Sequence, residues 1–168
     1  MSLTRKFLES LSTFAEISLK TSQNSTKATH EFGNFLFAAF EYGKSHSQLS
    51  DEDYKTVNSL LVNNLPDIEH CFENLIEDFH YNDISTYLIY RSGIEFVFSV
   101  SERITKNSGE KICLKSQEVV DTVEELDERI SGYWTAPADP LGAIPSTVDL
   151  KGVPDTHIWW ACFKLLKS

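Results

Sequence analysis

Apolar side chains recur at intervals of three and four residues through most of this 168-residue chain. That spacing places them on one face of an α-helix and leaves the polar residues on the opposite face. The first stripe consists of Leu3, Phe7, Leu11, Phe14 and Ile17. Because similar stripes follow along the chain, the sequence predicts a mainly α fold. We expect a single-domain helical bundle of about five or six helices.

Start and stop signals separate the stripes into individual helices. A second helix is predicted over about 27–42, with Gly43 as its stop. Ser50 followed by Asp53 resembles a capping box and predicts the start of a third helix. Pro66 predicts the first turn of a fourth, since proline is well tolerated there.

The middle of the chain allows two interpretations. Residues 87–104 keep helical spacing, but 94–100 is rich in β-branched and aromatic residues, so a strand is the alternative there. With the short apolar piece at 112–114, that alternative would give a short strand pair. A further helix is predicted over about 116–130, with Gly132 just beyond its end.

The character of the chain changes after residue 132. Every proline except Pro66 lies in this last part, and so do all three tryptophans. We predict a helical domain over 1–132, and over 133–168 a Pro-rich strap and an aromatic C-terminal segment packed on the same domain. Trp134 is either a binding residue, as tryptophan often is at interfaces, or one of the aromatics that anchor the strap on the core. His157 is expected to be a partly buried structural residue.

Acidic residues are concentrated in two segments. The formal net charge is −10, yet residues 49–83 hold nine acids against Lys55, and 118–131 hold six against Arg129. A charge of this sign argues against nucleic acid as a direct partner. The segments are either a docking surface for a basic protein or helix faces that serve solubility. The candidate partner-binding residues are Asp51, Glu52, Asp53, Glu69, Glu73, Glu77, Asp78, Asp121, Glu124, Glu125, Glu128 and Trp134.

Catalytic and metal-binding motifs are largely absent from the sequence. Glu77 and His80 match one Glu-x-x-His half-motif of di-iron bundles, but the chain has no second copy of it. There is no Gly-x-Ser-x-Gly elbow and no glycine-rich phosphate loop. The enzymatic alternatives are therefore this half-motif and a pair of acids brought together by the fold. We predict a protein that is not an enzyme and that has no catalytic residue, cofactor or metal site.

The sequence also gives an expectation for the compartment. It has no apolar run of the roughly 7–15 residues typical of a secretory signal, nor of the roughly 18 needed to cross a membrane. The three cysteines, Cys71, Cys113 and Cys162, have no CxxC spacing and are expected to be reduced. We therefore expect a cytoplasmic protein with no membrane partner.

A chain that is small, acidic, mainly helical and without a catalytic motif resembles the bacterial immunity proteins. Its closing pattern Val153-Pro154-x-x-His157-x-Trp159-Trp160 is similar to the Pro-x-x-His-Trp-Trp ends of some small immunity-like proteins. In character it is most similar to the immunity partners of contact-dependent growth inhibition toxins. The resemblance implies a protein that binds and neutralises a cognate toxin, commonly a basic nuclease. The alternative is a non-enzymatic cytosolic adaptor or regulatory protein with another protein partner.

Overall fold

The computed structural model describes residues 2–20, 25–45, 47–80, 84–108, 114–135 and 149–157. In these ranges the chain forms six helices and no strand. The helices are α1 (Leu3–Lys20), α2 (Ser25–Lys44), α3 (Asp51–Asn63), α4 (Leu65–Glu77), α5 (Ile84–Ser108) and α6 (Gln117–Thr135). The predicted mainly α fold is confirmed. The strand alternative over 94–100 is wrong, because that segment lies inside α5.

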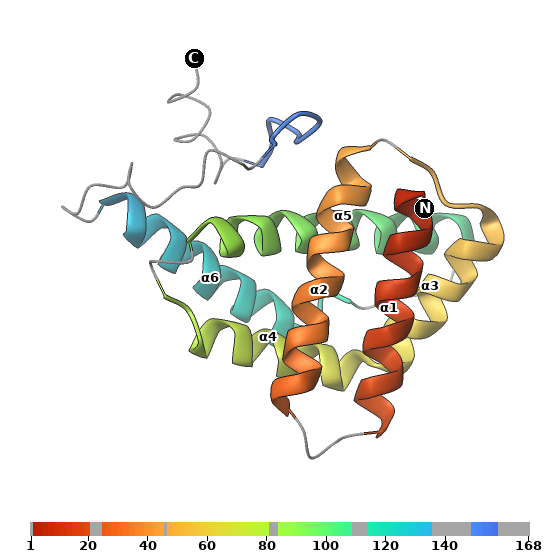
Figure 1. Cartoon of the computed structure of the whole chain (residues 1–168), viewed down its shortest axis with the longest axis horizontal. Coiled ribbons are helices and arrows are strands. Elements are labelled where there is room, and N and C mark those ends of the chain that lie inside the picture. The colour runs from red at the N-terminus through yellow and green to blue at the C-terminus, as the bar shows by residue number, and fades with distance from the viewer. Residues whose placement is uncertain are drawn as a thin grey trace.

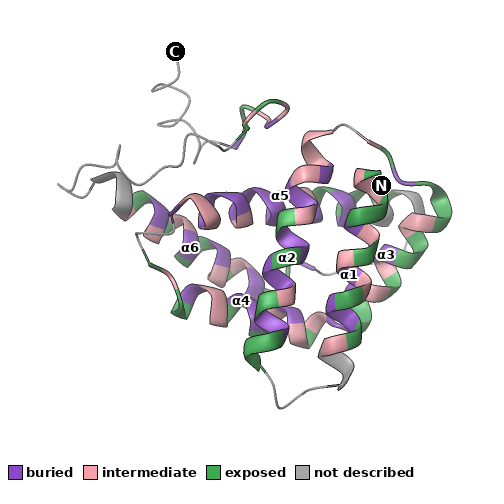
Figure 2. Ribbon diagram, viewed as in Figure 1, coloured by how far each residue is buried: buried purple, intermediate pink, exposed green. Residues whose placement is uncertain are grey.

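The helices pack in two sets that cross each other. α1 and α2 form an antiparallel hairpin that packs across α4 and α5, and α6 lies beside α4 and α5 (Figure 1). α3 lies at one end of the longest axis, whereas α6 extends toward the other end. The buried faces of the helices are turned toward one another (Figure 2). This arrangement matches the helical spacing of apolar side chains in the sequence, since Phe32, Phe35, Leu36, Ala39 and Phe40 of α2 are all buried.

Phenylalanine rings hold the crossing helices together. The ring of Phe32 in α2 lies with its centroid 5.2 Å from that of Phe14 in α1. It lies 4.8 Å from that of Phe72 in α4, in an edge-to-face arrangement. Aromatic pairs of this kind add about 0.5–1.5 kcal/mol beyond the area that they bury. Phe32 therefore connects three helices, and Phe72 attaches α4 to the hairpin.

The helix start signals of the sequence are confirmed. The backbone N–H of Asp53 donates to the Ser50 hydroxyl over 3.2 Å, and the backbone N–H of Ser50 donates to the Asp53 carboxylate over 3.3 Å. This capping box satisfies two donors that the first turn of α3 would otherwise leave unpaired. Pro66 lies in the first turn of α4, as predicted.

Two glycines predicted to end helices do not do so. α6 continues past Gly132 to Thr135, because one interior glycine costs a helix only about 1 kcal/mol. Gly43 lies in the last turn of α2 rather than beyond it. A Cβ at Gly43 would lie 2.2 Å from the ring of Phe96, so this glycine makes room for packing by α5.

The described part of the C-terminal segment, 149–157, packs against the helices. The Lys44 ammonium at the end of α2 donates to the backbone carbonyl of Asp149 over 2.9 Å. Gly152 has a φ of +85°, and a Cβ there would lie 2.3 Å from the Lys44 carbonyl oxygen. Both the backbone conformation and the close approach therefore require glycine at this position.

His157 fixes the end of this segment on α5. Its side chain is buried, and its Nδ1 lies 3.1 Å from the Ser92 hydroxyl oxygen. The imidazole also packs against Phe96 with a centroid distance of 4.9 Å. The predicted structural role of His157 is thereby supported. The prolines of 136–148 and the aromatic residues of 158–168 lie outside the described residues.

Candidate functional site

The α4 part of the first acidic segment lies beside the second acidic segment, which forms α6. The Ser116 hydroxyl, just before α6, donates to the Glu69 carboxylate of α4 over 2.6 Å. Further along, Ile76 of α4 and Val123 of α6 line one small apolar gap between the helices. We use the name acidic face for six exposed carboxylates of this pair of helices that form no ion pair among the described residues. Its members are Glu73, Glu77, Asp78, Asp121, Glu124 and Glu128.

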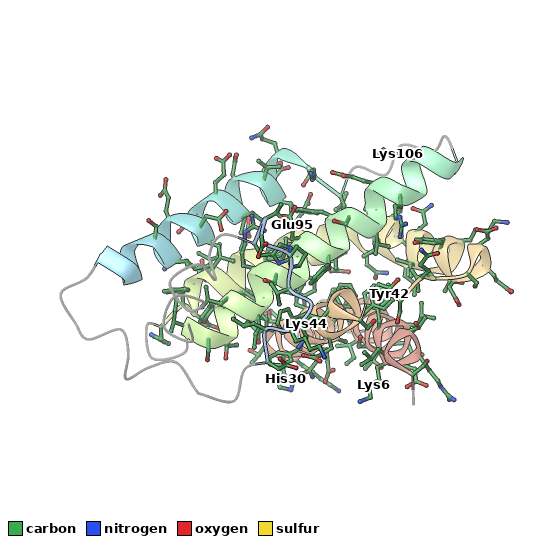
Figure 3. The ribbon with its side chains drawn as sticks, turned by 90° about the horizontal axis from the view of Figure 1, so that it is seen from above. Lys6, His30, Tyr42, Lys44, Glu95 and Lys106 are labelled. Atoms are coloured by element: carbon green, nitrogen blue, oxygen red, sulfur yellow. The ribbon has the colours of Figure 1, made fainter. Side chains whose placement is uncertain are left out.

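The acidic face lacks compensating positive charge. α4 with its C-cap Asp78 has five acidic residues and no Lys or Arg. α6 has six acidic residues and a single Arg, and side chains ending in oxygen project outward along it (Figure 3). In the described part of the chain, no Lys or Arg forms an ion pair with a carboxylate of the acidic face. Some surface acids elsewhere are paired, as Glu9 is with Arg5 and Glu102 with Lys115. The Lys115 hydrogen bond lowers the pKa of Glu102.

Some of the predicted acids have local partners instead. Glu69 accepts the Ser116 hydrogen bond, and Glu125 forms a 2.7 Å ion pair with Arg129 one turn later in α6. Trp134 lies in the last turn of α6, and its side chain is outside the described residues. The role of Trp134 in partner binding stays a prediction.

The acids of α3 lie apart from the acidic face. Asp51, Glu52 and Asp53 occupy the first turn of α3, at the opposite end of the molecule from α6 (Figure 1). Asp53 belongs to the capping box, and acids in a first turn are stabilised by the helix dipole. Their position thus has a local structural explanation that the members of the acidic face lack.

Arg91 attaches α6 to α5 beneath the acidic face. Arg91 is 8% exposed, and its Nε and Nη2 donate to the two Asp127 carboxylate oxygens over 2.7 and 3.2 Å. Its Nη1 donates to Glu95 of α5 over 3.0 Å (Figure 3, where Glu95 is labelled). Burial acts to lower the pKa of Arg91, but the Asp127 and Glu95 carboxylates outweigh it and raise the pKa. The guanidinium therefore stays charged and holds the two helices together.

We expect Asp127→Asn to lower the free energy of unfolding by about 1–3 kcal/mol, because it leaves a buried guanidinium with a weaker partner. Asp121→Asn is the matched control, since Asp121 is exposed and accepts only from Gln117 on its own helix. The control should change stability by less than about 0.5 kcal/mol. Urea unfolding at pH 7 measures both. If both substitutions lower the free energy of unfolding equally, the hydrogen bonds between Arg91 and Asp127 do not stabilise the fold.

A cavity opens where the acidic face ends. It has a volume of about 630 Å³ and lies among the first turns of α2, the end of α4 and the first turns of α5. Thr29, Asn74, Tyr87 and Tyr90 line it together with Glu77 and Asp78. Local sequence patterns do not reveal this site. Its residues come from three separate helices and share no motif, so only the packing of the helices brings them together.

The Glu77–His80 half-motif is not assembled into a metal site in the described part of the chain. α4 ends at Glu77, so His80 follows in non-helical chain and the helical i, i+3 geometry of the half-motif is not formed. Among the described residues, no three His, Cys, Asp or Glu side chains gather as a metal site would require. Cys71 is buried, and burial raises its pKa to about 11, which keeps the thiol protonated at neutral pH.

Comparison with protein-family models, with curated proteins and with solved structures finds no match to this chain. What the molecule itself defines is a mainly helical bundle with an uncompensated acidic face and a cavity at one end of that face. Within the described residues, no helix combines the length and apolar composition needed to cross a membrane.

Proposed function

We propose that this protein binds and neutralises a basic protein toxin, in the manner of an immunity protein, with the acidic face as its docking surface. One observation carries the proposal: two acidic helices lie side by side, and the exposed carboxylates of the acidic face have no ion-pair partner among the described Lys and Arg side chains. Glu73 and Glu77 lie one turn apart on α4, where like charges repel by a few tenths of a kcal/mol. A partner that supplies Lys and Arg would convert that repulsion into attraction.

The charge arrangement suits inhibition of an enzyme that acts on a polyanion. A nuclease presents Lys and Arg to phosphate groups, and carboxylates can pair with the same groups through charge-assisted hydrogen bonds. Complementary charge speeds encounter and fixes orientation more than it raises affinity. The proposed role needs no catalytic group on this chain, in keeping with the predicted absence of enzymatic activity.

The test uses candidate basic toxin domains encoded by genes that neighbour this protein's gene, each purified with and without this protein. We expect Glu73→Lys/Glu124→Lys to slow association by roughly tenfold or more at low salt, since both changes lie on the acidic face. The difference in association rate between the variant and the unchanged protein should shrink above about 0.15 M salt, because the charges are then screened. Stopped-flow fluorescence measures the rates, and survival of cells that express the toxin measures neutralisation.

Asp51→Lys/Glu52→Lys is the matched control, because it makes the same change in net charge at the far end of the molecule. Circular dichroism and urea unfolding verify that both variants fold. The control should associate nearly as fast as the unchanged protein. If both double variants are slowed alike, the acidic face is not the docking surface. If no basic toxin is bound or neutralised, the proposed function is wrong.

A further inference from the structure

The cavity at the end of α4 has the size of a binding site. Its volume of about 630 Å³ lies within the roughly 300–1,000 Å³ typical of pockets that hold small ligands. Three helices form it, and a hydrogen bond of 3.1 Å from Asn74 of α4 to the buried hydroxyl of Thr29 sets the spacing of α4 and α2 there. Its walls are therefore parts of the packed bundle.

Charge at the cavity is negative. Glu77 and Asp78 line it, both are exposed, and none of the described residues that line it is Lys or Arg. The last turn of α4 also ends at the cavity, and a helix C-terminus carries about half a negative charge. The first turns of α2 and α5 lie on the other side, each with about half a positive charge. The two full charges of the carboxylates outweigh these partial charges, so a cation is favoured.

An aromatic wall completes the cavity. The rings of Tyr87 and Tyr90 are nearly perpendicular, with centroids 5.8 Å apart. The Tyr87 hydroxyl donates to the backbone carbonyl of Asp78 over 2.7 Å, which fixes the ring against the end of α4. Tyr90 fits closely over Gly33 of α2, where a Cβ would lie 2.6 Å from its hydroxyl oxygen. Aromatic faces attract a guanidinium or ammonium group, and arginine uses them most often.

We propose that this cavity receives an arginine side chain of the basic partner, with its guanidinium between the carboxylates of Glu77 and Asp78 and its stem along Tyr87 and Tyr90. The inference rests on the proposed function, since it names the anchor by which the partner engages one end of the acidic face. A single Arg buried in a pocket is the kind of residue that dominates binding energy at protein interfaces.

The test on the isolated protein uses N-acetyl-arginine amide as the probe. Its uncharged counterpart of the same shape, N-acetyl-citrulline amide, is the control ligand. We expect the arginine probe to shift the amide NMR signals of Thr29, Asn74 and Tyr90 in the 15N-labelled protein, and the citrulline probe to leave them in place. Glu77→Gln/Asp78→Asn should weaken binding of the arginine probe roughly tenfold. Glu52→Gln, on α3, should not weaken it.

Several results would overturn the inference. They are equal shifts with both probes, arginine binding unaffected by Glu77→Gln/Asp78→Asn, or the same signals moved by inorganic phosphate. If spermidine saturates the cavity at concentrations at which the arginine probe does not bind, the ligand of the cavity is a free polyamine instead.

The toxin domain then separates this inference from the proposed function. If Glu73→Lys/Glu124→Lys slows association while Glu77→Gln/Asp78→Asn leaves toxin affinity unchanged, the docking face stands and the arginine pocket is wrong. If the pocket binds the arginine probe but no basic toxin is neutralised, the cation site stands and the proposed function is wrong.

Discussion

Gly93→Ala should lower the free energy of unfolding by about 2 kcal/mol, although alanine is the better helix former. Gly93 lies inside α5, where the exchange alone would favour the helix by about 1 kcal/mol. However, a Cβ at this position would lie 2.3 Å from the backbone carbonyl oxygen of Leu36 in α2. Backbone cannot move aside as a side chain can, so α2 and α5 must separate. Overpacking of this kind typically costs 1–3 kcal/mol and occasionally more.

Gly33→Ala is the matched control for Gly93→Ala. Its Cβ would meet the Tyr90 hydroxyl, the far end of a side chain that can shift. The gain in helix propensity and the cost of moving that ring should nearly cancel. Thermal unfolding measures both, and a loss of 2 kcal/mol corresponds to roughly 4–8 °C for a chain of this length. A Gly93→Ala protein as stable as the Gly33→Ala protein would contradict the close approach of α2 and α5.

The glycines mark the limit of what the sequence predicts about the fold. The helices, their inward faces and the capping box at Ser50 follow from local patterns, and the structure confirms them. The roles of Gly33, Gly43 and Gly93 depend on a second helix that passes close by, and local patterns do not contain that information. Gly43 and Gly132 were expected to end helices because a glycine that ends a helix and one that lies within it look alike in sequence.

The same limit applies to the candidate site. Clustering of acids was visible in the sequence, but whether α3, α4 and α6 present them together depends on the packing of the bundle. The structure places α4 beside α6 and leaves Asp51 and Glu52 at the far end. It also shows Asp127 bound to the buried Arg91, a pairing across 36 positions that no spacing rule predicts. The cavity near Glu77 was missed for the same reason.

Phe32→Ala should have the largest effect on stability, a loss of about 3–5 kcal/mol. Phe32 is 1% exposed, and its ring packs on Phe14, Phe35 and Phe72, so the truncation leaves a cavity where three helices meet. Phe37→Ala is the matched control on the same helix, because Phe37 is 42% exposed and contacts Tyr90 only edge-to-face at 6.5 Å. The control should lose less than about 1 kcal/mol.

The two phenylalanine variants, compared by urea unfolding and by hydrogen exchange, also test how the acidic face is supported. A domain is stable by only about 5–15 kcal/mol, so Phe32→Ala brings the bundle close to unfolding. Since Phe72 attaches α4 to α2 through Phe32, we expect hydrogen exchange of the α4 amides to quicken more than that of the α3 amides. Phe32→Leu, which fills much of the cavity, should restore protection in α4. Equal loss of stability in Phe32→Ala and Phe37→Ala would show that α4 is held in place without this aromatic cluster.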